Sequence, residues 1–347
     1  MKKTLALLCA LAMVFALCAC GQTAAPAAPA APSASPEAAP EASPAAEAAP
    51  AAADDAKTFT VGVCQLVQHP ALDAATQGFQ DALKEKLGDK VSFSVQNASG
   101  DSATCSTICS QFASDGVDLI MANATPSVLA AASVTGTIPI LGTSVTDYAS
   151  ALGIEDWSGA TGLNISGTSD LAPLDSQAEI LAELFPEAKT VGILFCSAEP
   201  NSKFQVETIT PFFEESGYKV MAYPFADSNE VSIKTQDAVS ECDVLYIPTD
   251  NTAASCAEAI NNVALPAGVP IIAGESGLCS GCGVATLSID YYDIGVKTAE
   301  MAFDILVNGA DVSTMEIAYA PVFTKMFNAD VCKTLGIEVP DDFTAIG

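Results

Sequence analysis

The chain has 347 residues, with 42 acidic side chains against 13 lysines, no arginine and one histidine, giving a net charge of −29. Nucleic acids and other polyanions are bound through basic side chains, and phosphate or sulfate groups are commonly held by the arginine fork. This composition therefore argues against both classes of partner.

The N-terminus has the pattern of a lipoprotein signal. Two lysines follow the initiator methionine, residues 5–17 are apolar, and Cys20 comes directly after the small residue Ala19. A basic start, a short apolar core and a small residue at the exit are typical of secretory signals, and the apolar run is shorter than the ~20 residues of a spanning helix. We expect residues 1–19 to be removed and Cys20 to carry diacylglycerol on the outer face of the cell membrane; an ordinary signal peptide is the alternative.

Residues 20–57 form a low-complexity segment, which consists of the cysteine followed by alanine and proline with scattered Ser, Glu and Asp. Such a composition offers almost no apolar surface to bury, so it predicts a disordered, partly polyproline II tether.

Nine cysteines remain beyond Cys20, an odd number scattered over a chain long enough to build its own core. This distribution favours buried free thiols over a disulfide framework. The Cys279–Cys282 spacing leaves a disulfide as the alternative, and a single such pair without a histidine cluster is a weak zinc signal.

The first half of the body alternates strands and helices. Short Val/Ile-rich runs predict strands, and amphipathic stretches between them predict helices, as in a parallel sheet covered on both faces. The strands are expected at 59–66, 91–95, 117–121 and 138–141, and the helices at 102–114 and from Pro70 and Pro126 onward.

The pattern then restarts as a second α/β unit. Strands are expected at 190–195, 219–223, 244–247 and 270–273, and helices at 174–184, 203–216, 231–239, 253–264 and 294–308. Two doubly wound units place a cleft between them, and ligands of such sheets bind beyond the carboxyl ends of the strands.

Polar loops follow the predicted strands, and they supply the candidate ligand-binding residues. Each Ser, Thr, Asn or Asp taken alone is an ordinary helix cap, but six such loops converging on one cleft favour a binding site. The candidates are Gln65, His69, Thr125, Ser127, Ser144, Asp147, Ser197, Asn201, Ser202, Asp250, Asn251 and Glu275.

Four ordered motifs carry a family resemblance. Residues 63–73 (VCQLVQHPALD), 197–202 (SAEPNS), 247–251 (IPTDN) and 289–295 (IDYYDIG) resemble the substrate-binding lipoproteins of ABC transporters related to the tryptophan-binding protein TrpX. The resemblance covers the chain from residue 59 onward.

The resemblance implies a type I periplasmic-binding-protein fold, in which two parallel-sheet lobes joined by a hinge close on a ligand. Lobe 1 is expected to comprise 58–171 plus 292–318, and lobe 2 is expected to comprise 172–291 plus 319–347. The partners implied are an ABC permease and its ATPase, with the binding protein acting as a monomer and without cofactor or metal.

The implied ligand is an aromatic or other apolar amino acid. Its carboxylate is expected to bind hydroxyls and backbone N–H groups at helix N-termini, and its ammonium group is expected to pair with Asp250 or Asp147. Asn251 is expected to fix the orientation of the ligand. His69 is expected either to contact the ligand or to assist closure. The carboxylate candidates are Thr125, Ser127, Ser197, Asn201 and Ser202.

Two other classes of function compete with transport. One histidine and no local nucleophile–base set argue against an enzyme. A sensing receptor of the same fold, or a binder of another small molecule, stays open.

Overall fold

The computed structural model describes residues 57–346. The predicted signal peptide, the lipidated Cys20 and all but the last residue of the tether lie outside the described residues. No helix in the described part combines the length and apolar character needed to cross a membrane.

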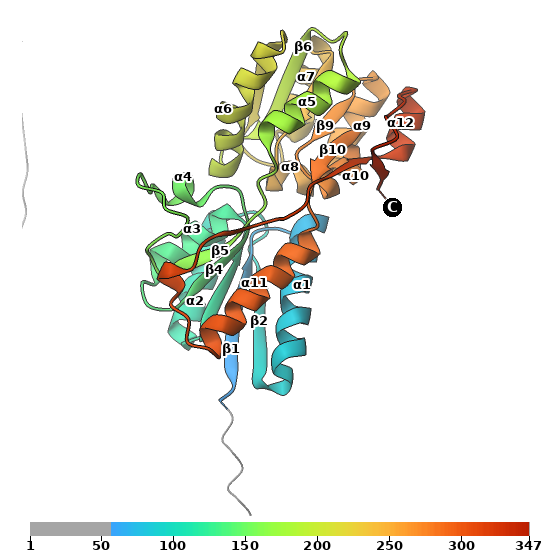
Figure 1. Cartoon of the computed structure of the whole chain (residues 1–347). Helices are drawn as coiled ribbons and strands as arrows, with labels where there is room; N and C mark the ends of the chain where they lie inside the picture. Colours follow the sequence, from blue (N-terminus) through green and yellow to red (C-terminus); the bar gives the residue numbers. More distant parts are fainter. Residues whose placement is uncertain (1–56, 347) are drawn as a thin grey trace, which may run out of the picture. The chain divides into compact units, whose positions relative to one another are not determined.

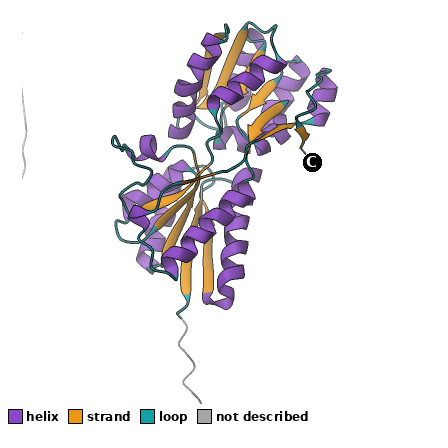
Figure 2. Ribbon diagram, viewed as in Figure 1, coloured by secondary structure: helices purple, strands orange, loops and turns teal. Residues whose placement is uncertain are grey.

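Lobe 1 is built on a six-stranded parallel sheet with the order β11-β5-β4-β3-β1-β2 (Figures 1 and 2). The apolar cores show that α2 and α3 cover one face of the sheet, while α1 and α11 cover the other. Coverage on both faces explains why the central strands are buried along their whole length. The strands are β1 (Phe59–Gln65), β2 (Val91–Asn97), β3 (Leu119–Asn123), β4 (Ile140–Val145), β5 (Ile165–Ser169) and β11 (Ala318–Tyr319); the helices are α1 (Pro70–Leu87), α2 (Ser102–Asp115), α3 (Thr125–Val134), α4 (Tyr148–Leu152) and α11 (Tyr291–Leu306), with 3-10 turns at Gly88–Lys90 and Val312–Thr314.

Lobe 2 is built on a seven-stranded sheet with the order β13-β12-β10-β9-β8-β6-β7, parallel except where β12 pairs antiparallel with β10. Apolar cores again lie on both faces. The strands are β6 (Thr190–Cys196), β7 (Lys219–Phe225), β8 (Val244–Ile247), β9 (Ile271–Ala273), β10 (Ala285–Ser288), β12 (Thr324–Phe327) and β13 (Thr344–Ala345); the helices are α5 (Leu174–Leu184), α6 (Pro200–Glu215), α7 (Val231–Glu241), α8 (Asn251–Ser255), α9 (Ala257–Ala267), α10 (Ser276–Cys282) and α12 (Ala329–Leu335).

Three crossovers connect the lobes, after β5, between β10 and α11, and between β11 and β12. Helix α11 follows β10 of lobe 2 but packs along α1 in lobe 1. The two helices approach closely at glycines, because a Cβ on Gly295 would lie 2.1 Å from the carbonyl oxygen of Ala75. The architecture is thus the predicted pair of doubly wound parallel-sheet lobes.

Several elements differ from the sequence prediction. The helix predicted at 253–264 is two helices, α8 and α9, with a break at Cys256, and α6 begins at Pro200 rather than at residue 203. Strands β5 and β10 were not predicted, because ISGTS and ATLS are short and rich in small polar residues. Beyond α11 the chain forms three further short strands and α12, for which the sequence predicted no element.

The nine cysteines from Cys64 to Cys332 are free thiols, and all except Cys256 are buried. Cys279 and Cys282 both lie on α10, where they pack in the apolar core of lobe 2.

Candidate functional site

Among the cavities lined by residues of both lobes, two of about 210 and 220 Å³ contain predicted site residues. Cavity 1 is bordered by Leu66 and Pro126 of lobe 1 and by Glu199 and Asn251 of lobe 2. Both cavities lie where the strands end and the following helices begin, as expected for ligand sites in open α/β sheets. Cavity 2 is lined by Thr125, Asp147, Ser150, Ala151, Pro200, Asn201, Lys203, Phe204 and Glu207.

Three long helices begin at this interface without a side-chain cap. The N-cap residues of α1, α3 and α6 are His69, Ala124 and Glu199, and none of their side chains accepts a hydrogen bond from the first turn. The first turn of a helix carries N–H groups without an intrahelical partner and the positive end of its dipole. The N-termini of α3 and α6, which pack against each other across the interface, are therefore suited to hold a carboxylate.

Four of the predicted residues carry buried polar atoms that no described group satisfies. These atoms are Nδ1 of His69, Oγ1 of Thr125, Oγ of Ser144 and Oδ1 of Asn201. Buried polar side-chain atoms are normally hydrogen-bonded, so these atoms, three at helix starts and one near the end of β4, are candidates for contact with a ligand.

Backbone strain gathers in the same loops. Among the described residues, the non-glycine residues with positive φ are Ser99 (55°), Ala124 (89°) and Ser144 (54°). Each lies at or just after the end of a lobe 1 strand, and Ser99 lines cavity 1. Non-glycine residues in this conformation cost of order 1–3 kcal/mol and gather at ligand clamps and active sites.

The predicted carboxylates Asp250, Asp147 and Glu275 are helix N-caps. Asp250 caps α8, and its oxygens accept hydrogen bonds from Ala253 N (2.8 Å), Cys196 N (2.6 Å) and Ser202 Oγ (2.7 Å). Burial, and then the charge of Glu199, raise the pKa of Asp250 above its ordinary value. These bonds tie Asp250 to the interior of lobe 2.

Asp147 is placed differently. One of its oxygens caps α4 by accepting from Ser150 N (2.7 Å), and the residue also lines cavity 2. Glu275 accepts from the backbone N–H groups of Gly277 and Leu278 at the start of α10, and burial raises its pKa to about 7. Of the three carboxylates, Asp147 is the one that borders a cavity.

Three further candidates bond within their own lobe. Gln65 accepts from Thr76 Oγ1 (2.7 Å) and donates to Asp73 Oδ1 (2.6 Å). Ser197 donates to the carbonyl oxygen of Phe225 (3.0 Å). Ser127 lies against two thiols, with its Oγ 3.5 Å from the sulfur of Cys105 and 3.8 Å from that of Cys64.

Glu199 is a central polar residue that the sequence prediction omitted. Its Oε1 accepts from the backbone N (2.8 Å) and Oγ1 (2.7 Å) of Thr252, and its Oε2 accepts from Asn251 Nδ2 (2.6 Å) and Asn201 Nδ2 (3.1 Å). It thus joins the starts of α6 and α8 on the lobe 2 side of cavity 1. Its position between a strand end and the Pro-Asn-Ser start of a helix was the available signal.

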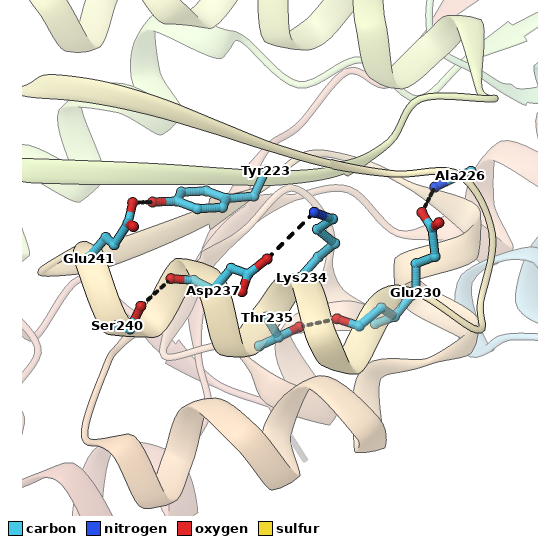
Figure 3. A network of polar contacts seen from close by, with 9 residues as sticks. Tyr223, Ala226, Glu230, Lys234, Thr235, Asp237, Ser240 and Glu241 are labelled. Carbon is cyan, nitrogen blue, oxygen red and sulfur yellow. Dashed lines mark hydrogen bonds and ion pairs between the residues drawn. The ribbon is translucent and has the colours of Figure 1, made fainter.

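The loop between β7 and α7, which borders cavity 1 through Ala226, Asp227 and Ser228, is held by its own helix. Figure 3 shows Glu230 accepting a hydrogen bond from Ala226 N (2.8 Å) and, at the far end of α7, Glu241 accepting from the Tyr223 hydroxyl (2.9 Å). The first contact ties the loop to the N-cap residue of α7, and the second ties the last residue of α7 to β7, so both hold this wall of the cavity.

Within residues 57–346 no group of three or more His, Cys, Asp or Glu side chains is arranged to hold a metal ion. The geometry instead offers helix N-termini, hydroxyls, amides and one available carboxylate. These hydrogen-bond donors and acceptors suit a small polar organic ligand.

Comparisons with known proteins agree with this geometry. A family model described as ABC transporter substrate binding protein matches residues 60–346. A tyrosine-binding protein of Clostridioides difficile (strain R20291) is 37% identical over 288 residues, which are 82% of this chain and 83% of that protein.

Two solved structures are similar over the same region. The ABC domain from Streptococcus pneumonia in complex with L-Trp has a TM-score of 0.78 at 31% identity, covering 82% of this chain and 97% of that one. The ligand-free, open structure of a substrate-binding protein with adhesive properties from Clostridium difficile has a TM-score of 0.63 at 39% identity, covering 83% and 99%. The conformation described here is therefore more similar to the structure with tryptophan than to the open one, although the latter is more similar in sequence.

Proposed function

The chain belongs to the ABC transporter substrate-binding protein family, and from this premise we propose that it captures an aromatic amino acid between its lobes and delivers it to a membrane permease. The ligand class is supported by the tyrosine-binding relative and by the similar structure that holds L-Trp. As a binding protein, it does no chemistry on its ligand.

One observation supports the binding site above the others. Unpartnered buried atoms of Thr125 and Asn201 lie at the facing starts of α3 and α6, and both residues line cavity 2. There the amino acid's carboxylate receives hydrogen bonds from backbone N–H groups and from the Thr125 hydroxyl.

The ammonium and the ring are assigned from the same cavity. Asp147 pairs with the ammonium group of the ligand, because Asp250 already accepts three hydrogen bonds inside lobe 2. The half-buried Phe204 supplies an apolar wall against which an aromatic ring packs.

Delivery depends on the predicted membrane anchor. Lipid at Cys20 keeps a ligand-capturing domain close to the permease, which raises its effective concentration there. Replacing Cys20 with serine is expected to move the protein from the membrane fraction to the medium; retention of the variant in the membrane fraction would contradict the anchor.

The function is tested by calorimetric titration of the mature protein with tyrosine, tryptophan, phenylalanine, leucine, lysine and a monosaccharide. We expect one ligand per monomer, with the aromatic amino acids bound most tightly. Binding of the sugar alone would favour the alternative of a different small-molecule ligand. A strain lacking the protein separates transport from sensing, because loss of uptake of the labelled ligand is expected only for a transport component.

A further inference from the structure

One hydrogen bond joins the two lobes at the cleft. Nε2 of His69, at the start of α1 in lobe 1, lies 3.2 Å from Oδ1 of Asn251, at the start of α8 in lobe 2. Both side chains are buried, with 6% and 8% of their surface exposed. Among residues 57–346, every other side-chain hydrogen bond or ion pair outside the three crossovers joins groups of the same lobe.

The network behind Asn251 identifies the donor in this bond. Nδ2 of Asn251 donates to Oε2 of Glu199 (2.6 Å), a carboxylate that can only accept when ionised. The amide oxygen of Asn251 therefore faces His69, and the proton between the lobes belongs to Nε2 of His69. A neutral ring is then protonated at Nε2 and carries a lone pair at Nδ1, the atom left without a partner.

We propose that His69, Asn251 and Glu199 form a latch that holds the lobes closed over the bound ligand, with neutral His69 as the donor. The latch rests on the proposed function, because it regulates the same cleft. Glu199 is its fixed end, since it also accepts hydrogen bonds from the starts of α6 and α8.

The charges around the ring set the direction of its pH dependence. The hydrogen bond to Asn251, Glu199 across the cleft and Asp73 on α1 all favour the imidazolium ion. Burial outweighs these interactions and lowers the pKa of His69 from its ordinary value of 6.5.

The latch therefore weakens as the pH falls. An exposed ring in the open state takes up a proton near its ordinary pKa, and that proton must be released before the lobes close. Affinity is expected to be full above pH 7 and to decline below about 6.5, so acid favours release.

The histidine is the only one in the chain, so its ring can be observed without assignment. The test uses mature protein labelled with ¹⁵N-histidine and carrying a tag without histidine. The two ring nitrogens are followed by NMR between pH 5 and 8, with and without L-tyrosine. With ligand we expect a protonated Nε2, an unprotonated Nδ1 and a lowered pKa; an Nδ1–H tautomer, or a titration that the ligand leaves unchanged, would overturn the latch.

Two variants give a matched comparison. In His69→Gln an amide donor without a titratable proton can replace Nε2–H, whereas His69→Leu removes the donor and leaves the Asn251 oxygen unpaired. At pH 7.5 we expect His69→Leu to bind L-tyrosine about tenfold more weakly, mainly through faster dissociation, and His69→Gln to stay near the wild type. Between pH 7.5 and 5.5 the wild type should lose more affinity than His69→Gln, by at most about tenfold.

Equal losses of affinity for L-tyrosine in both variants, or no loss in either, would overturn the latch while leaving the proposed function intact. If the wild type binds no amino acid, the proposed function fails, and the latch is then tested by titrating the histidine ring in the ligand-free protein. Identical ring titrations in the wild type and in Asn251→Ala would then overturn it, and a difference would support it.

Discussion

At the residue scale, the Thr125 hydroxyl offers a direct test of the site. Its Oγ1 is buried without a hydrogen-bond partner, so Thr125→Val removes no described hydrogen bond and keeps the side-chain shape. We expect the free energy of unfolding without ligand to be unchanged or slightly higher, and affinity for the amino acid to fall by about 1 kcal/mol or more, because one donor to its carboxylate is lost. Chemical unfolding and calorimetric titration measure the two quantities.

Thr286 is the matched control for this substitution. Its hydroxyl is also buried and unpartnered, but it lies on β10 inside lobe 2 and lines neither cavity. Thr286→Val should leave affinity as in the wild type. Equal losses of affinity in both variants would show that the effect at Thr125 is indirect and would remove it from the site.

The sequence could identify the loops of the site but not the direction of each side chain within them. Thr125 and Ser127 are two residues apart, yet one lines cavity 2 and the other lies against buried thiols, because they occupy different faces of the first turn of α3. Asp250 was predicted as a ligand group, and the prediction stays untested; its oxygens bond three groups inside lobe 2 that only tertiary structure brings together. Glu199 was missed because four of its five hydrogen bonds come from Asn251 and Thr252 at the start of α8, about fifty residues away, and only the fifth is local.

At the element scale, the contact between α1 and α11 holds the last long helix on lobe 1. In Gly295→Ala the new methyl group would lie 2.1 Å from the carbonyl oxygen of Ala75, and backbone cannot move aside as a side chain can. The two helices must separate, and we expect a loss of ~2 kcal/mol in the free energy of unfolding, measured with urea. Gly136→Ala is the control, because nothing lies within 4 Å of its Cβ position; equal effects would contradict the packing argument.

The first crossover carries Asp170, a buried carboxyl whose Oδ2 accepts from the Tyr291 hydroxyl (3.0 Å) while its Oδ1 has no partner. Burial raises the pKa of Asp170 to about 6, above the ordinary value near 4. The folded state therefore holds its proton more tightly than the unfolded chain. Its contribution to stability is full below about pH 4, declines between pH 4 and 6, and stays lost above that range.

Asp170→Asn removes this titration while keeping an acceptor for Tyr291. Relative to the wild type, the variant should be more stable by on the order of 2 kcal/mol at pH 8 and nearly equal at pH 4. Urea unfolding at several pH values measures this difference, in which the other titrating groups cancel. A difference that does not vary with pH would show that the carboxyl keeps its ordinary pKa in the folded protein.

Periodicity located the long strands and helices because their apolar faces are continuous, as in β6 and α5. It could not locate β11 to β13, which have two to four residues each and are strands only because a sheet edge is present to receive them. The break between α8 and α9 could not be predicted either, because alanines on both sides favour a single helix. The hydrogen bonds of the buried Asp250 cap, which only the structure reveals, fix the short helix α8.

At the scale of the whole molecule, the acidic charge has few lysine partners within residues 57–346. The chain carries a net charge of −29, and the ion pairs of the described part all join a lysine to a carboxylate on partly or fully exposed surface, where such pairs contribute little. Mutual repulsion of carboxylates therefore disfavours the compact state at low ionic strength.

Salt separates this repulsion from ligand recognition. The Debye length falls from about 30 Å at 0.01 M to about 8 Å at 0.15 M, so we expect the urea midpoint to rise over this range as the surface charges are screened.

An amino-acid zwitterion has no net charge, and its affinity should change less than about twofold over the same range. A ligand with a net positive charge is attracted by the acidic surface as a whole, so its affinity should fall several-fold when the salt concentration is raised over this range. Titrating L-tyrosine and a diamine at both salt concentrations distinguishes the cases: a strong salt dependence for tyrosine would mean that long-range charge, rather than the buried groups of the cleft, dominates its binding.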